Sequence, residues 1–244
     1  MTARSLLIRG MLVGVVAAAL AFVFAKVFGE PQVDRAIAFE AGHETSGVVV
    51  PMLVDRSVQA SWGLGIATAV YGAALGGIFG LAFAFAYGRL GRLTARGTAL
   101  FVAGLGFVAV FLVPYLKYPA NPPSVGRSDT IGQRTGLYFT MLLISVAAAI
   151  GAVLVARSLA PRLGTWYAVL AATGGFLAVV VLAGQVLHTV DEVPADFPAT
   201  LLWRFRLASL GMQAVLWATF GLLFGELTER ALRHRARTGA TPVG

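Results

Sequence analysis

Six long apolar segments constrain this chain more than any other feature of its sequence. Hydrophobic residues make up 58% of its 244 residues and charged residues only 12%, against roughly 25% charged in soluble domains. About 20 apolar residues suffice for a helix to cross the roughly 30 Å hydrocarbon core of a bilayer. The segments therefore predict an all-α integral membrane protein. They form a single membrane domain over residues 1–244, a bundle of about six transmembrane helices covering residues 6–28, 60–87, 98–116, 131–156, 166–187 and 197–225.

Basic residues gather on one side of this predicted bundle. With six spans, that side comprises the N-terminal end, the loops at residues 88–97 and 157–164, and a basic tail at residues 226–244. It holds 11 of the 19 lysines and arginines but only two of the 11 acids. Because basic residues favour the cytoplasmic side of a membrane, both termini are predicted to be cytoplasmic. The net charge of +8 is thus explained by orientation, without nucleic-acid binding.

The second segment contains three glycines at intervals of four residues, Gly72, Gly76 and Gly80. Small residues at this spacing form one face of a helix, where a neighbouring backbone can approach closely. The pattern predicts tight helix packing.

The stretch from residue 185 to residue 196 contains the best candidate for a metal site. If the fifth helix continues past residue 187, one of its sides presents Gln185, His188, Asp191 and Glu192. A neutral imidazole with nearby carboxylates suits a divalent first-row metal such as Co²⁺, Ni²⁺, Zn²⁺ or Mn²⁺. Pro194 limits how far such a helix can run. A lone histidine beside acids is also common as a surface hydrogen-bonding group. Three further acids, Asp196, Glu30 and Asp34, are predicted to lie on the same extracytoplasmic side of the membrane as this stretch.

Polar side chains also occur within and beside the last apolar segment. Arg204 and Arg206 lie near its start, on different faces of a helix. The face of Arg206 also carries Ser209 and Gln213, which could line a hydrated interior path. Snorkelling of the arginines to the headgroups, with ordinary helix packing, explains the same pattern. The external basic residues Lys117 and Arg134 could pair with the acids or receive an anion.

Several function classes lack their signatures in this sequence. It contains no cysteine, no HExxH pair, no phosphate-binding loop of the Walker type and no nucleophile elbow. We therefore expect no enzymatic activity, no transport driven by ATP hydrolysis in this chain, and no permanently bound cofactor.

Three stretches together resemble a known family. They are Phe28-Gly-Glu-Pro-Gln-Val-Asp-Arg-Ala-Ile-Ala-Phe-Glu40; Val113-Pro-Tyr-Leu-Lys-Tyr-Pro-Ala-Asn-Pro-Pro123 with Thr130-Ile-Gly-Gln-Arg-Thr135; and Asp191-Glu-Val-Pro-Ala-Asp-Phe-Pro198 with Leu202-Trp-Arg-Phe-Arg-Leu-Ala-Ser-Leu210. The chain resembles the CbtA family of predicted cobalt transporter subunits. The resemblance implies a multi-pass protein of the bacterial inner membrane, usually counted with five spans and associated with cobalamin synthesis. It also implies Co²⁺ as the transported ion and a separate, small, one-span, histidine-rich companion of the CbtB type.

Two hypotheses of different classes follow. In the first, the chain is a transporter subunit that admits Co²⁺ through an acidic extracytoplasmic mouth, where Lys117, Arg134, Arg204 and Arg206 hold the external loops. In the second, it is a non-conducting membrane scaffold whose external motifs bind a partner. The apolar segments carry no central acid, which favours the scaffold. A carrier for another solute and a homo-oligomer remain open.

Overall fold

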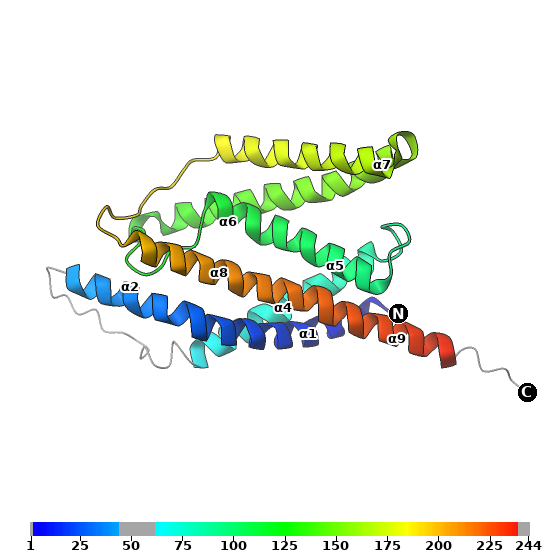
Figure 1. The fold of residues 1–244 in the computed structure, drawn as a ribbon, viewed down its shortest axis with the longest axis horizontal. Helices are drawn as coiled ribbons and strands as arrows, with labels where there is room; N and C mark the ends of the chain where they lie inside the picture. The colour runs from blue at the N-terminus through cyan, green and yellow to red at the C-terminus, as the bar shows by residue number, and fades with distance from the viewer. Residues whose placement is uncertain (1, 44–61, 239–244) are drawn as a thin grey trace, which may run out of the picture. The chain divides into compact units, whose positions relative to one another are not determined.

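The computed structural model describes residues 2–43 and 62–238, and within these ranges all regular elements are helices (Figure 1). Five of them are long and apolar enough to cross a membrane: Ala3–Gly42, Leu64–Ala86, Ala95–Lys117, Ser128–Val186 and Ala199–Ala236. The predicted all-α membrane fold is confirmed. Internal contacts divide the chain into two compact units. The first unit is Met1–Gly104 with Leu207–Gly244, and the second unit is Leu105–Arg206.

The first helix is much longer than the predicted span at residues 6–28. It runs through α1 (Ala3–Phe24), the π-helical turn η1 (Ala25–Gly29) and α2 (Glu30–His43). Thr2 caps its start by accepting a hydrogen bond from the amide of Ser5. The helix continues past residue 28 because η1 widens it immediately before Pro31. A proline lacks an N–H and crowds the carbonyl four residues earlier, and a π turn moves that carbonyl away.

The glycines of α4 (Leu64–Ala86) pack against α1, as the spacing predicted. Gly72 and Gly76 lie against the backbone oxygens of Gly14 and Gly10 so closely that a Cβ atom on either would collide with them. Gly80 approaches the carbonyl of Leu6 in the same way. The two backbones can approach this closely because glycines occupy the points of closest contact. Residues 60–61, at the start of the predicted second span, lie outside the described ranges.

Aromatic rings form much of the remaining core of the first unit. Phe79 stacks on Phe220 with a centroid distance of 5.2 Å, and Phe224 meets the rings of Phe79 and Phe83 edge-on at 5.2 and 5.0 Å. These four side chains are almost fully buried. Rings in such offset and edge-on arrangements add to the stability from apolar burial.

The third helix begins three residues before the predicted span at residues 98–116. It consists of α5 (Ala95–Gly106), the π-helical η3 (Phe107–Leu112) and α6 (Val113–Lys117). The carboxylate of Glu229 accepts the N–H of Ala95 at 3.0 Å and so caps the start of α5. η3 precedes Pro114 just as η1 precedes Pro31, and the helix again continues past the proline.

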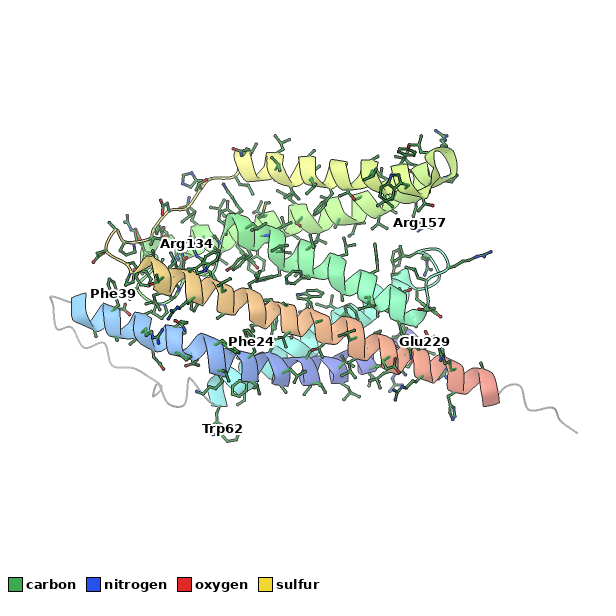
Figure 2. The ribbon with its side chains drawn as sticks, in the orientation of Figure 1. Phe24, Phe39, Trp62, Arg134, Arg157 and Glu229 are labelled. Carbon is green, nitrogen blue, oxygen red and sulfur yellow. The ribbon has the colours of Figure 1, made fainter. Side chains whose placement is uncertain are left out.

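The fourth and fifth predicted spans belong to α7 (Ile131–Val186), which follows the short 3₁₀ turn η4 (Ser128–Thr130). Gly164 interrupts α7 with φ 77°, ψ 158°, and the two arms lie antiparallel (Figure 1). The predicted loop at residues 157–164 is wrong in extent, because Pro161 and Arg157 lie in the helical first arm (Figure 2). Only a glycine adopts this positive φ without strain. If each arm of α7 crosses the membrane once, the chain has six crossings. This count remains a prediction, as does the cytoplasmic placement of both termini.

The last helix extends past the predicted span at residues 197–225. It consists of α8 (Ala199–Thr219), the π-helical η5 (Phe220–Phe224) and α9 (Gly225–Thr238). Most of the predicted basic tail is therefore helical. Glu226 pairs with Arg96 at 2.6 Å and with Arg230 one turn along α9. Arg9 of α1 donates to the buried hydroxyl of Thr228 at 3.1 Å.

Candidate functional site

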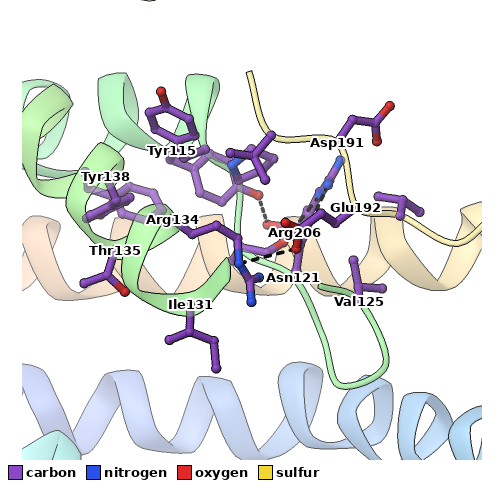
Figure 3. Close-up of a pocket in the computed structure, with 16 residues that line it drawn as sticks. Tyr115, Asn121, Val125, Ile131, Arg134, Thr135, Tyr138, Asp191, Glu192 and Arg206 are labelled. Atoms are coloured by element: carbon purple, nitrogen blue, oxygen red, sulfur yellow. Dashed lines mark hydrogen bonds and ion pairs between the residues drawn. The ribbon is translucent and has the colours of Figure 1, made fainter. Parts of the chain in front are cut away.

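The second unit contains a cavity of about 440 Å³ (Figure 3). Its walls come from α6 and the connection that follows, from the first turns of α7, from residues 190–193, and from the start of α8. Two of the three motifs that resemble the CbtA family meet there. The lining residues are Phe111, Tyr115, Tyr118, Pro119, Ala120, Asn121, Val125, Ile131, Arg134, Thr135, Tyr138, Val190, Asp191, Glu192, Val193 and Arg206.

Prolines shape the wall that follows α6. The helix ends at Lys117 because Tyr118 precedes Pro119, and a proline ring disfavours the helical conformation of the residue before it. The chain then turns at Pro122, whose carbonyl accepts the N–H of Val125 at 3.3 Å. Pro122 and Val125 are buried, so this connection is anchored on the unit.

Glu192 joins three separate parts of this site. Its Oε2 accepts the N–H of Arg127 at 2.8 Å and lies 3.5 Å from Nε of Arg134. The hydrogen bond with the Thr130 side chain lowers the pKa of Glu192 most, and the Arg127 amide and the charges of Arg134 and Arg127 lower it further. The carboxylate is therefore held in its ionised form.

Arg134 completes this contact from the first turn of α7. Its guanidinium donates to the carbonyl of Arg127 at 2.9 Å, in addition to the ion pair with Glu192. Gly126 allows the approach, since it has φ +108° and a Cβ atom there would collide with the guanidinium. The positive φ favours glycine at this position, and a larger residue would also displace the guanidinium from its present place.

Arg206 binds the proline-rich connection rather than an acid. Its guanidinium donates to Oδ1 of Asn121 at 3.0 Å and makes a longer contact, 3.4 Å, with the carbonyl of Ala120. Its own carbonyl accepts the hydroxyl of Tyr115 at 2.6 Å. In the described part of the chain, this half-buried cation therefore meets neutral oxygens only.

The fifth helix does not continue past residue 187, so the condition for a shared helical face is not met. α7 ends at Val186, and Leu187 is extended with ψ 137°. The following residues are held by side chains from the end of α6. Tyr118 donates to the carbonyl of His188 at 2.8 Å, and Lys117 donates to the hydroxyl of Thr189 at 2.8 Å. These contacts favour an extended connection over another helical turn.

The predicted metal residues are consequently not on one helical face. Asp191 and Glu192 line the cavity, while His188 and Asp196 are exposed elsewhere in the connection. Glu30 and Asp34 lie on α2, in the first unit. In residues 2–43 and 62–238, no three histidine, cysteine or acidic side chains come together as a metal-binding group.

The predicted polar path residues are also separated. Arg134 and Arg206 line the cavity, Lys117 holds Thr189, and Arg204 and Gln185 are exposed outside it. Ser209 and Gln213 are half-buried on the part of α8 that belongs to the first unit. Within the described residues, Oε1 of Gln213 is buried without a hydrogen-bond partner. A hydrated path along this face remains a prediction.

Sequence reasoning missed the neutral residues of the cavity, chiefly Tyr115, Tyr118, Tyr138 and Asn121. Tyr115, Tyr118 and Asn121 belong to the proline-rich motif that carried the family resemblance. Their presence in that motif was the signal by which the sequence could have identified them as site residues. The hydrogen bonds of Tyr115 and Tyr118 to backbone carbonyls, and of Asn121 to the guanidinium of Arg206, could not be read from spacing.

Comparison with known proteins supports a family assignment. The family model CbtA, described as probable cobalt transporter subunit (CbtA), matches residues 3–229. The comparisons find no match among curated proteins and none among solved structures. Since the matched region covers nearly the whole chain, including both sets of motifs around the cavity, the chain belongs to the CbtA family of probable cobalt transporter subunits.

Proposed function

We propose that this chain admits Co²⁺ from the extracytoplasmic side through an acidic mouth formed around the cavity of the second unit. The observation that carries the proposal is that Asp191 and Glu192 both line this cavity. The chain is a membrane protein of a transporter-subunit family, which supplies the class of cargo. The distribution of basic residues supports an orientation in which the cavity faces the outer side of the membrane.

The two carboxylates have different roles in this proposal. Asp191 is exposed and offers an accessible negative charge to an arriving cation. Glu192 is ionised but held by Arg134, so a cation must compete with the guanidinium to reach it. His188 and Asp196, from the same connection, add donors beside the mouth.

The family description as a subunit implies a partner. We infer a separate one-span companion of the CbtB type, whose histidines capture the metal before this chain conducts it. Histidine is scarce here, with three in the whole sequence, which supports such a division of labour. The bacterial inner membrane is the proposed location, with this chain acting as a carrier subunit and not as an enzyme.

The test is uptake of radioactive Co²⁺ by cells that lack other cobalt importers. The chain is expressed with and without its companion, and Asp191→Asn, Glu192→Gln and the double variant are compared at equal membrane abundance. Asp129→Asn is the matched control, since Asp129 is an exposed acid that pairs with Arg127 outside the cavity. We expect reduced uptake in the two single variants, a greater loss in the double variant, and little change in the control.

The outcomes separate the candidate functions. Uptake that is unaffected in the double variant contradicts the acidic mouth but leaves transport intact. No uptake by the wild-type chain with its companion present contradicts cobalt transport. That result favours the hypothesis of a non-conducting scaffold. The lack of a central acid in the apolar segments supports the same hypothesis.

A further inference from the structure

Within the described residues, the Arg206 guanidinium at the cavity wall is not paired with an acid. Its donors meet Oδ1 of Asn121 and the carbonyl of Ala120, and these two oxygens carry no formal charge. Arg134, the other basic residue of the cavity, is paired with Glu192. A guanidinium has five N–H donors arranged as a planar fork that matches a carboxylate. The positive charge of Arg206 and its remaining N–H donors are thus available to bind an anion within the site.

The cavity is also larger than a hydrated metal ion requires. An ion with six waters occupies roughly 200 Å³, because each water takes about 30 Å³. The cavity volume is about 440 Å³, which lies in the range of small-molecule sites. Tyrosine rings and aliphatic side chains, among them Val125 and Ile131, form much of its wall. Such a lining suits an organic ligand better than a hydrated inorganic ion.

The protein supplies few metal ligands of its own at this place. Asp191 and Glu192 are the acids of the cavity wall, and Glu192 is already engaged. In the ranges that the structure describes, no group of three histidine, cysteine or acidic side chains could hold an ion. A metal that kept an organic ligand would need fewer donors from the protein.

We infer that the cavity binds Co²⁺ together with a small organic carboxylate that is already coordinated to it. In this arrangement Arg206 binds a carboxylate group of the complex, and Asp191 and Glu192 face its cationic centre. The inference rests on the proposed function and adds the chemical form of the cargo. Arg206 is the specificity-determining residue for that form.

The test measures binding to the purified full-length chain in lipid nanodiscs by calorimetry. The probes are Co²⁺ alone, a 1:1 Co²⁺–citrate complex, citrate alone, and the complex with excess inorganic phosphate. We expect the complex to bind at least tenfold more tightly than Co²⁺ alone, with phosphate competing weakly. Strong competition by phosphate contradicts a carboxylate site and indicates a general anion site.

Variants assign the effect to Arg206. Arg206→Gln is expected to weaken binding of the complex about tenfold while leaving Co²⁺ alone within twofold. Arg206→Lys keeps the charge but loses the fork, so it should recover only part of the affinity. Arg157→Gln is the charge-matched control, because that side chain is exposed on α7 and does not line the cavity.

Asn121→Asp is a second variant that tests the same point if Arg206→Gln fails to fold. The new carboxylate would still accept the hydrogen bond from Arg206 but would neutralise its charge. It should therefore weaken binding of the complex with the fold intact. Equal affinity for Co²⁺ and its citrate complex, or a parallel loss of both in Arg206→Gln, overturns the inference. Failure of the proposed function would instead appear as absent cobalt uptake, which the binding measurement does not require.

Discussion

Oε2 of Glu192 lies 2.8 Å from the amide nitrogen of Arg127 and 3.5 Å from Nε of Arg134. One carboxylate oxygen therefore links three segments: the connection after α7, the residues just before α7, and the first turn of α7. The Glu192 side chain is only 12% exposed, and that of Arg134 is 27% exposed, so solvent screens this contact less than a surface ion pair. The walls of the cavity depend on this junction.

Glu192→Gln should lower the stability of the protein in a pH-dependent way. The pKa of Glu192 is lower in the folded protein than the value near 4.3 of an unfolded glutamate. Its contribution to stability is therefore fully present above about pH 5 and is lost as the pH falls through the folded-state pKa. The difference in Tm between wild type and Glu192→Gln should be constant from pH 7 to 5 and shrink below about pH 4. A difference that grows on acidification would contradict this assignment.

Gly76→Ala should destabilise the packing of α1 on α4. Its methyl group would collide with the carbonyl oxygen of Gly10, and overpacking of this kind typically costs about 1–3 kcal/mol. The free energy of unfolding can be followed by tryptophan fluorescence of the purified protein. Gly174→Ala is the matched control, since a Cβ atom there meets open space and alanine favours the helix by up to about 1 kcal/mol. Equal stability of the two variants would refute the close contact.

Glu229→Ala should destabilise the start of α5. The carboxylate accepts the N–H of Ala95, and loss of a helix cap typically costs about 1 kcal/mol. Arg233→Ala removes only the i,i+4 partner of Glu229 and should cost no more than about 0.5 kcal/mol. Thermal unfolding of both variants measures the difference. A larger effect of the arginine substitution would show that the ion pair, and not the cap, is the stabilising contact.

Tyr115→Phe should destabilise the attachment of α6 to the start of α8. The hydroxyl of Tyr115 donates to the carbonyl of Arg206 at 2.6 Å, and a lost hydrogen bond of this kind costs about 1 kcal/mol. Tyr167→Phe serves as control, because that side chain is 65% exposed on α7. Chemical denaturation gives both values. If the two substitutions have the same effect, the Tyr115 hydrogen bond does not stabilise the unit.

The local sequence pattern was sufficient to predict helix contacts that depend on the spacing of nearby residues. The interval of four residues at Gly72, Gly76 and Gly80 correctly predicted close packing, because residues four apart share one face of a helix. The partner positions Gly10 and Gly14 have the same spacing and could have been recognised. The break between the fourth and fifth segments was also placed correctly near Gly164, although the helix reaches the break itself.

Local pattern did not predict where two of the helices end. The π turn η1 lets the first helix pass Pro31 and continue to His43, and nothing in the composition of residues 25–43 announces that turn. At the other end of the site, α7 ends at Val186, so His188 and Asp191 do not share a face of it. Contacts from Lys117 and Tyr118 hold the following residues extended, and local propensity does not include them.

The sequence by itself determined the membrane fold and the positions of the apolar segments, because transfer of long apolar runs into lipid depends on composition and length. The family motifs likewise identified the cobalt transporter-subunit family from the sequence alone. Only the tertiary structure decided which motif residues share a cavity. Glu192 meets the amide of Arg127 across 65 residues, and Arg206 meets Asn121 across 85. Such pairings are set by the packing of α6, α7 and α8, and not by any local periodicity.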